Sequence, residues 1–172
     1  MALLGIDDTL HELLQCVSQA LADDEAPVCS VGGTLGQPAI ASCCDCGDGE
    51  GELWGNLVRV YRSQQAGLAD APPQKPCLPA HWSAEYRITL ARCFPVIDES
   101  GELPSVEART EATARGHADV ATVHRAIHCC GETEPPYLVG IQVETDPAGG
   151  CSFLVATVRV PVSLHKRQNL RA

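Results

Sequence analysis

The last third of the sequence holds the pattern that most limits the fold. Two runs of β-forming residues, "YLVGIQVE" and "CSFLVATVRVPVSL", flank the turn-forming segment "TDPAGG". Two such runs around a short turn are typical of a β-hairpin. Two earlier runs alternate apolar and polar residues in a similar way. The sequence therefore predicts a sheet in which most neighbouring strands are antiparallel.

The two earlier runs flank a long connection, residues 63–81, that is rich in proline. In the run at 53–62, alternation predicts one face with Leu57, Arg59 and Tyr61 and an opposite face with Trp54, Val58 and Val60. In "AEYRITLARCF" it predicts one face with Tyr86, Ile88, Leu90 and Phe94, opposite Glu85, Arg87 and Thr89. A loop as long as this connection is usually functional or mobile.

Two segments have the spacing of amphipathic helices. In the first, apolar residues recur at helical spacing: Ile6, Leu10, Leu13, Leu14, Val17 and Leu21. Asp7 and Asp8 suit its start, by capping and by interaction with the helix dipole. The second begins after Ser105, a plausible N-cap, and continues to about Cys130, with a buried side of Val120, Val123 and Ile127. After the first helix, "GGTLGQP" predicts a turn.

These elements together predict an α+β fold, with a mostly antiparallel or mixed sheet and two main helices packed on it. A chain of 172 residues is most simply one domain, 1–172. No apolar run approaches the roughly 18–20 residues of a membrane span. The N-terminus lacks the features of a signal peptide. We therefore expect a protein that is made and kept in the cytosol, with no membrane partner.

The formal net charge of -10 argues against binding to nucleic acid. Proteins that grip the nucleic-acid backbone release counterions with a surplus of basic side chains, which this chain lacks. The one basic concentration is the C-terminal arm, 163–172, which contains Lys166, Arg167 and Arg171. The arm is either a solvated, frayed terminus or a segment that docks on an acidic neighbour. The sequence leaves both interpretations open.

Three cysteines stand within four residues in "ASCCDCGDGEGE". Cys43 and Cys46 have the spacing of a zinc half-site, and His124 and His128 could supply two more ligands from the second helix. The two halves are much farther apart in the sequence than in compact zinc modules, so we predict no metal and keep these four residues as candidates. A redox motif is not favoured. In such motifs the cysteines stand at the start of a helix, whereas here a strand is expected to follow them.

The remaining question about the ten cysteines is whether they form disulfides. Free cysteines are commonly small buried hydrophobic residues, and we expect most of them to be buried thiols. A protein that is assembled in a cell and works outside it can oxidise later, so the presence of one or more disulfides stays an alternative. No G-x-S-x-G elbow, Walker loop or G-x-G-x-x-G is present. We therefore expect no enzyme and no cofactor.

The element order and several segments resemble the tail terminator proteins of long-tailed bacteriophages of actinobacteria. The segments are "LLGIDDTLHELLQCVSQAL", "CCDCGDGEGELWGNLVRVYRS", "CLPAHWSAEYRITLARCFPV", "DVATVHRAIHCC" and "GGCSFLVATVRV", which together span almost the whole chain. The resemblance implies a virion protein, assembled in the host cytoplasm, that forms a hexameric ring at the head-proximal end of the tail tube. Its expected partners are copies of itself, the major tail tube protein and the head-tail stopper or connector protein. Genomic DNA would pass through the lumen without specific binding.

Interface residues are expected in the long loop and in the basic arm, because binding usually resides in loops on a rigid scaffold. The candidates are Pro72, Pro73, Lys75, Pro76, Lys166, Arg167 and Arg171. The alternatives are another phage neck or minor tail protein, or a small zinc- or thiol-dependent enzyme that uses Cys43, Cys46, His124 and His128.

Overall fold

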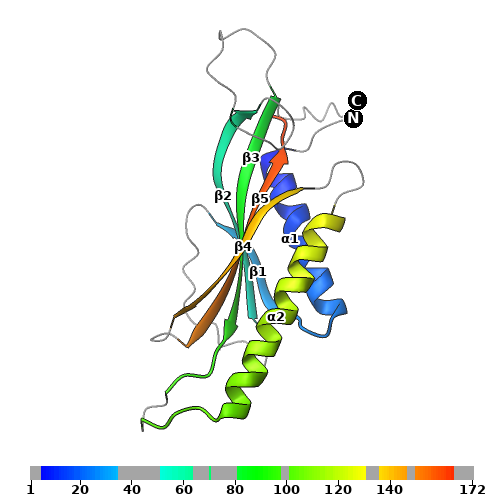
Figure 1. Ribbon diagram of the computed structural model, residues 1–172. Helices are drawn as coiled ribbons and strands as arrows, with labels where there is room; N and C mark the ends of the chain where they lie inside the picture. Colours follow the sequence, from blue (N-terminus) through cyan, green and yellow to red (C-terminus); the bar gives the residue numbers. More distant parts are fainter. Residues whose placement is uncertain are drawn as a thin grey trace.

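The computed structural model is one α+β domain, as the sequence predicts, and it describes residues 5–34, 51–63, 70, 81–97, 101–130, 136–146 and 150–164. Its elements are α1 (Ile6–Asp23), β1 (Val28–Thr34), β2 (Gly51–Ser63), β3 (His81–Cys93), α2 (Val106–Cys129), β4 (Tyr137–Asp146) and β5 (Cys151–Pro161). Figure 1 shows a twisted sheet with both helices on one side. We call the opposite side the outer face of the sheet. In the part of the chain that the structure describes, neither helix is long and apolar enough to cross a membrane.

The five strands form one mixed sheet in the order β1-β2-β3-β5-β4. β1 and β2 are parallel, and the other three pairs are antiparallel. The predicted hairpin is confirmed, because β4 and β5 pair along their length. β3 lies at the centre, between β2 and β5, and β1 and β4 lie at the two edges of the sheet.

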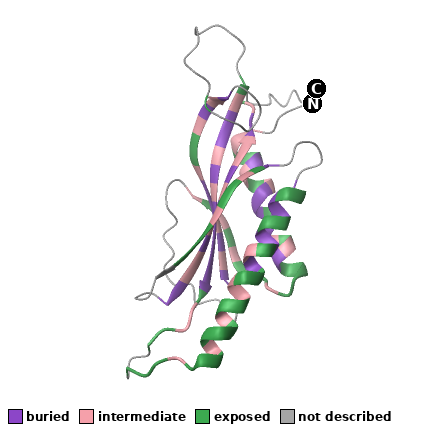
Figure 2. Ribbon diagram, viewed as in Figure 1, coloured by how far each residue is buried: buried purple, intermediate pink, exposed green. Residues whose placement is uncertain are grey.

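One core lies between the sheet and the helices (Figure 2). The central strand contributes Tyr86, Ile88 and Leu90, as its alternation predicts. The helices contribute the apolar positions that their spacing predicts, among them Leu13, Leu14, Val17 and Leu21 from α1 and Val123 and Ile127 from α2. Full burial of such a side chain contributes about 1.5–3 kcal/mol, so this cluster is the main stabilising feature of the fold.

The helix ends agree with the predictions except at one point. α2 begins after Ser105, whose side chain accepts a hydrogen bond of 3.0 Å from the backbone N–H of Ala108. α1 begins after Gly5, which makes no side-chain cap. Asp7 and Asp8 lie inside the first turn, where they interact favourably with the helix dipole but do not cap the end. Their predicted capping role is therefore wrong.

The turn predicted at "GGTLGQP" is wrong for its first three residues, because β1 continues to Thr34. Gly32 pairs with Trp54 of β2, and a Cβ at Gly32 would lie 2.5 Å from the Trp54 ring. Gly33 lies against Leu10 of α1. The glycines therefore permit close packing in a strand, where the sequence pattern alone indicated a turn.

The strict alternation predicted for residues 53–62 is also wrong. The register of β2 on β3 shifts between Leu57 and Arg59, which marks a β-bulge at Val58. Because a bulge reverses the faces that follow it, Leu57 and Val60 both pack against the core. Arg59 and Tyr61 lie on the outer face, away from Leu57.

Candidate functional site

All seven predicted interface residues lie outside the described residues. This holds for Pro72, Pro73, Lys75 and Pro76 of the long loop and for Lys166, Arg167 and Arg171 of the basic arm. Asp70 is the loop residue that the structure describes. It forms a β-bridge with Ser63, and its carboxylate lies 3.0 Å from the Arg59 guanidinium. The loop is thus attached to the end of β2 at this residue.

The candidate metal ligands are only partly described. Cys43 and Cys46 lie outside the described residues. His124 and His128 are exposed on α2, and their ring centroids are 4.5 Å apart with the planes tilted by 57°. Over the described ranges, no group of three or more His, Cys, Asp or Glu side chains is placed to hold a metal ion. The two imidazoles contact each other as a pair on the helix surface.

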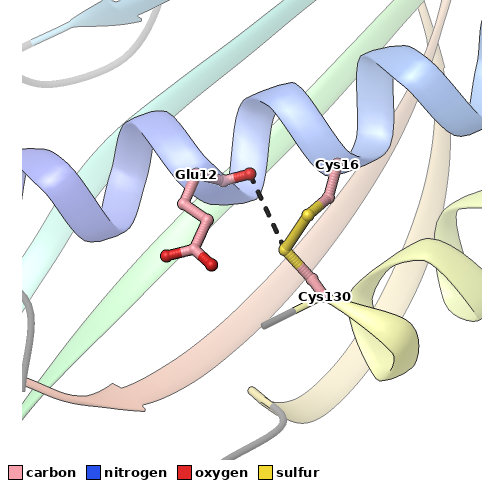
Figure 3. The surroundings of a disulfide bond; sticks show 3 residues. All are labelled: Glu12, Cys16 and Cys130. Carbon is pink, nitrogen blue, oxygen red and sulfur yellow. Dashed lines mark hydrogen bonds between the residues drawn. A yellow bond between two sulfur atoms is a disulfide. The ribbon is translucent and has the colours of Figure 1, made fainter. Parts of the chain in front are cut away.

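The cysteines differ from the expectation of buried thiols. Cys16 of α1 and Cys130, which follows α2, form a disulfide with a Cα–Cα distance of 5.8 Å (Figure 3). Cys29, Cys93 and Cys151 are also disulfide-bonded. Among the described cysteines only Cys129 is free, and it is exposed. The prediction that most cysteines are thiols is therefore wrong for the described ones.

The Cys16–Cys130 bond joins α1 to the residue that directly follows α2. The Cys130 sulfur lies 3.6 Å from the carbonyl oxygen of Glu12 (Figure 3). A disulfide sulfur carries no proton, so this contact becomes a hydrogen bond only when the bond is reduced. The disulfide fixes the end of α2 against the middle of α1 and so limits relative motion of the helices.

A buried ion pair between β3 and α2 was not anticipated from the sequence. Arg92 donates two hydrogen bonds to Asp119, and its remaining donors reach the carbonyl oxygens of Ala26 and Pro27 at 2.7 and 2.9 Å. One guanidinium thus joins the central strand, α2 and the connection from α1 to β1. Asp119 stands four residues before Val123 and so shares its buried side of α2, and this spacing is the signal that could have indicated a buried acidic residue.

A further polar contact joins the end of α1 to α2. The carboxylate of Asp24 accepts hydrogen bonds from the Thr122 hydroxyl and the Arg125 guanidinium. These bonds hold the pKa of Asp24 below its usual value. The end of α1 is therefore attached to the second half of α2.

The outer face of the sheet carries a cluster of charged and aromatic side chains, which we call the arginine cluster: Arg59, Tyr61, Glu85 and Arg159. Glu85 accepts hydrogen bonds from Arg59 at 3.2 Å and from Arg159 at 2.9 Å. Both guanidinium groups lie near the Tyr61 ring, at 4.7 and 5.8 Å from its centroid. Hydrogen bonds to Glu85 and Asp70 raise the pKa of Arg59, and burial raises the pKa of Tyr61. Together with Asp70, which pairs with Arg59, Glu85 provides two carboxylates for the two guanidinium groups.

Beside this cluster, two cross-strand neighbours have unsatisfied polar atoms. Asn56 of β2 pairs in register with Arg87 of β3. Within the described residues, neither the Asn56 Oδ1 atom nor the Arg87 Nε atom, both buried, has a hydrogen-bond partner. An unsatisfied buried polar group costs about 1–3 kcal/mol. The polar side chains of the outer face are therefore less completely hydrogen-bonded here than in the arginine cluster.

Comparisons with solved structures find similar chains, of which one is described here. No protein-family model matches the chain, and no curated protein matches it. A solved structure described as "Virion of native gene transfer agent (GTA) particle" contains a chain with a TM-score of 0.44 and 9% identity, over 89% of this chain and 90% of that one. A similarity at this level carries no conclusion about function.

Proposed function

We propose that the chain is a structural protein of a phage virion, and more specifically a subunit of the tail terminator ring. The ring would sit at the head-proximal end of the tail tube, stop its polymerisation and bind the head-tail connector. The sequence resemblance suggests this role. The helix–strand–helix–hairpin order on which the resemblance depends agrees with the fold.

The observation that carries the proposal is that the described sheet ends in two different edge strands. Among the described strands, β1 and β4 each pair with a neighbour on one side only. Subunits in a ring bind head-to-tail, through two different surfaces that close by rotation. Exposed strand edges are ready sites for such binding, because their backbone groups can pair with another chain. Over the described residues, the sheet therefore has two different edge surfaces, as a head-to-tail ring subunit needs.

The charge distribution supports a subunit that lies near DNA without binding it. α1 contains no Lys or Arg, and Asp7, Asp8 and Asp23 are exposed on it. On the outer face, Arg59 pairs with Asp70 and Glu85, and Arg159 pairs with Glu85. Paired guanidinium groups of this kind offer less to the nucleic-acid backbone than free basic side chains do.

The proposed role is non-catalytic and needs no cofactor. In the described part of the chain, the polar contacts of Arg92, Asp24 and Glu85 each join two or more elements, as a structural role requires. The partners we propose are further copies of the chain, the tail tube protein and the head-tail connector.

A tube-length assay tests this function. The tube protein from the same genome is polymerised with and without the chain, and tube lengths are measured by electron microscopy. A terminator shortens the tubes and binds at one end of each. Tubes of unchanged length with the chain bound at an end would indicate another neck protein. No binding to tubes at all would refute the terminator role.

A further inference from the structure

We propose that His124 and His128 together bind one divalent transition-metal ion, such as Zn²⁺, through their imidazole nitrogens. The inference goes beyond the proposed function and does not depend on it. Three observations lead to it: the positions of the two residues on α2, the contact between their rings, and the charge at this end of the helix.

Both histidines lie on the exposed side of helix turns that the core holds in place. Residues four apart on a helix are neighbours on one face, with Cβ atoms about 5–6 Å apart. His124 and His128 are both exposed, while Val123 and Ile127 of the same turns are fully buried. Two histidines at this spacing are an arrangement with which helices bind zinc in metalloproteases. The packing of α2 therefore fixes the backbone of both ligands before an ion binds.

The two rings lie close enough to share an ion. Their centroids are 4.5 Å apart, and their planes are tilted by 57°. A zinc–nitrogen bond is about 2.0–2.1 Å long, so two nitrogens on one tetrahedral ion are about 3.3 Å apart. Exposed side chains reach that separation by rotation about their own bonds. Across the described residues, neither ring has a hydrogen bond or an ion pair that must break first.

The charge at this end of α2 favours a cation. α2 ends at Cys129, so His128 lies in its last turn. The C-terminal end of a helix carries a partial negative charge, which attracts cations. Arg125, the cationic neighbour of His124 in the sequence, already pairs with the carboxylate of Asp24. Its positive charge therefore opposes the ion less than that of an unpaired guanidinium.

The ligand type selects the class of metal. Imidazole nitrogen suits Zn²⁺, Cu²⁺ and Ni²⁺, whereas Mg²⁺ and Ca²⁺ prefer oxygen ligands. Zinc takes four ligands in a tetrahedral arrangement, so water or a group of another molecule fills the two remaining positions. The site differs from the zinc site considered from the sequence, because it needs neither Cys43 nor Cys46. Since α2 packs on the core without the ion, binding should be reversible and should leave the fold unchanged.

The free thiol of Cys129 is the competing ligand. It is exposed and follows His128 directly. Successive helix residues point about 100° apart, so Cys129 projects away from the face that His124 and His128 share. A site made of His128 and Cys129 would not need His124, and this difference defines the test.

The test is a calorimetric titration with Zn²⁺ of the full chain, prepared without a polyhistidine tag and with its disulfides intact. We expect a site that both His124→Ala and His128→Ala weaken by at least about tenfold, since the second imidazole binds an ion already held by the first. His117→Ala is the matched control. This residue is exposed on the same helix, about 10 Å along the axis from His124, which is too far to share an ion. His117→Ala and Cys129→Ala should leave the affinity unchanged.

A variant that moves the pair tests the spacing directly. In the His128→Ala chain, Ala121→His places a histidine four residues after His117 and three before His124, on the exposed side of α2. Both spacings bring side chains together on one helix face. We expect this double variant to regain an affinity within about tenfold of that of the wild type. Far-UV circular dichroism checks that each variant is folded.

Four results would overturn the proposal: no saturable zinc binding, unchanged binding in either single histidine variant of the pair, an equal loss in Cys129→Ala, or no recovery in the double variant. None of them bears on tube termination, which the tube-length assay decides independently.

Discussion

Arg92 and Asp119 form a buried ion pair of two hydrogen bonds, from Nε to Oδ2 at 3.1 Å and from Nη2 to Oδ1 at 3.0 Å. Their side chains are 6% and 3% exposed. Because Arg92 also binds two backbone carbonyls before β1, this pair determines how α2, β3 and the start of β1 meet.

Removal of one partner of this pair should be strongly destabilising. Asp119→Ala leaves the Arg92 guanidinium buried without a counter-charge, and we expect a loss of about 3–5 kcal/mol in the free energy of unfolding. Chemical denaturation with the disulfides intact measures this loss. The matched control is Asp70→Ala, which removes a carboxylate from an exposed pair and should cost at most about 1 kcal/mol. Equal losses in the two variants would contradict the account.

The Cys16–Cys130 disulfide should stabilise the fold. The double variant Cys16→Ala/Cys130→Ala should lose about 2–4 kcal/mol, since the bond restricts the unfolded chain. Cys129→Ala removes the adjacent free, exposed thiol and should change stability by no more than about 0.5 kcal/mol. Denaturation curves give both values. A peptide map under non-reducing conditions that links Cys16 to Cys129 would show that the pairing is wrong.

Two glycines on strands should respond in opposite ways to alanine. A Cβ at Gly51 would lie 2.3 Å from the backbone oxygen of Ala91, so Gly51→Ala forces the strands apart and should cost about 1–3 kcal/mol. A Cβ at Gly140 meets nothing within 4 Å. Gly140→Ala should therefore be neutral or stabilise by up to about 1 kcal/mol. Thermal unfolding compares the two, and a similar loss in both would argue against the β2–β3 packing.

Tyr86 should make stability depend on pH in the alkaline range. Its side chain is fully buried, its hydroxyl donates to the Ile6 carbonyl at 2.9 Å, and burial raises its pKa above the usual 10.0. Below about pH 10 both the folded and the unfolded state keep this proton, so the contribution of Tyr86 is constant. Above pH 10 the unfolded state loses the proton first, and stability falls as pH rises.

Tyr86→Phe tests this dependence. The variant lacks the hydrogen bond and should be about 1 kcal/mol less stable at neutral pH. It should also lose less stability than the wild type between pH 10 and pH 11, as measured by denaturant titration at each pH. Parallel curves for the two proteins in that range would rule out a titrating Tyr86.

The elements with regular periodicity could be predicted from the sequence. Three local patterns agree with the fold: the apolar spacing of α1, the N-cap Ser105 before α2, and the alternation of Tyr86, Ile88 and Leu90. The same rules failed where packing between elements determines the local structure. Gly32 extends a strand because the Trp54 ring lies beside it, and the bulge at Val58 reverses the faces of β2.

The candidate site was less predictable, because its contacts join residues that are distant in the sequence. Nothing local to Arg92 indicates Asp119 or the carbonyls of Ala26 and Pro27 as partners. In the same way, cysteine positions alone do not determine pairing, and the Cys16–Cys130 bond depends on how the two helices pack. The arginine cluster likewise depends on the register of β2, β3 and β5.

Electron microscopy of purified phage particles tests the virion assignment most directly. The chain is given a compact C-terminal tag in the phage genome, and particles are imaged with and without the tag. The account predicts one ring of additional density between the tail tube and the head connector, with six tags around it. Particles that contain no copy of the chain, or tag density at any other position, would contradict the terminator assignment.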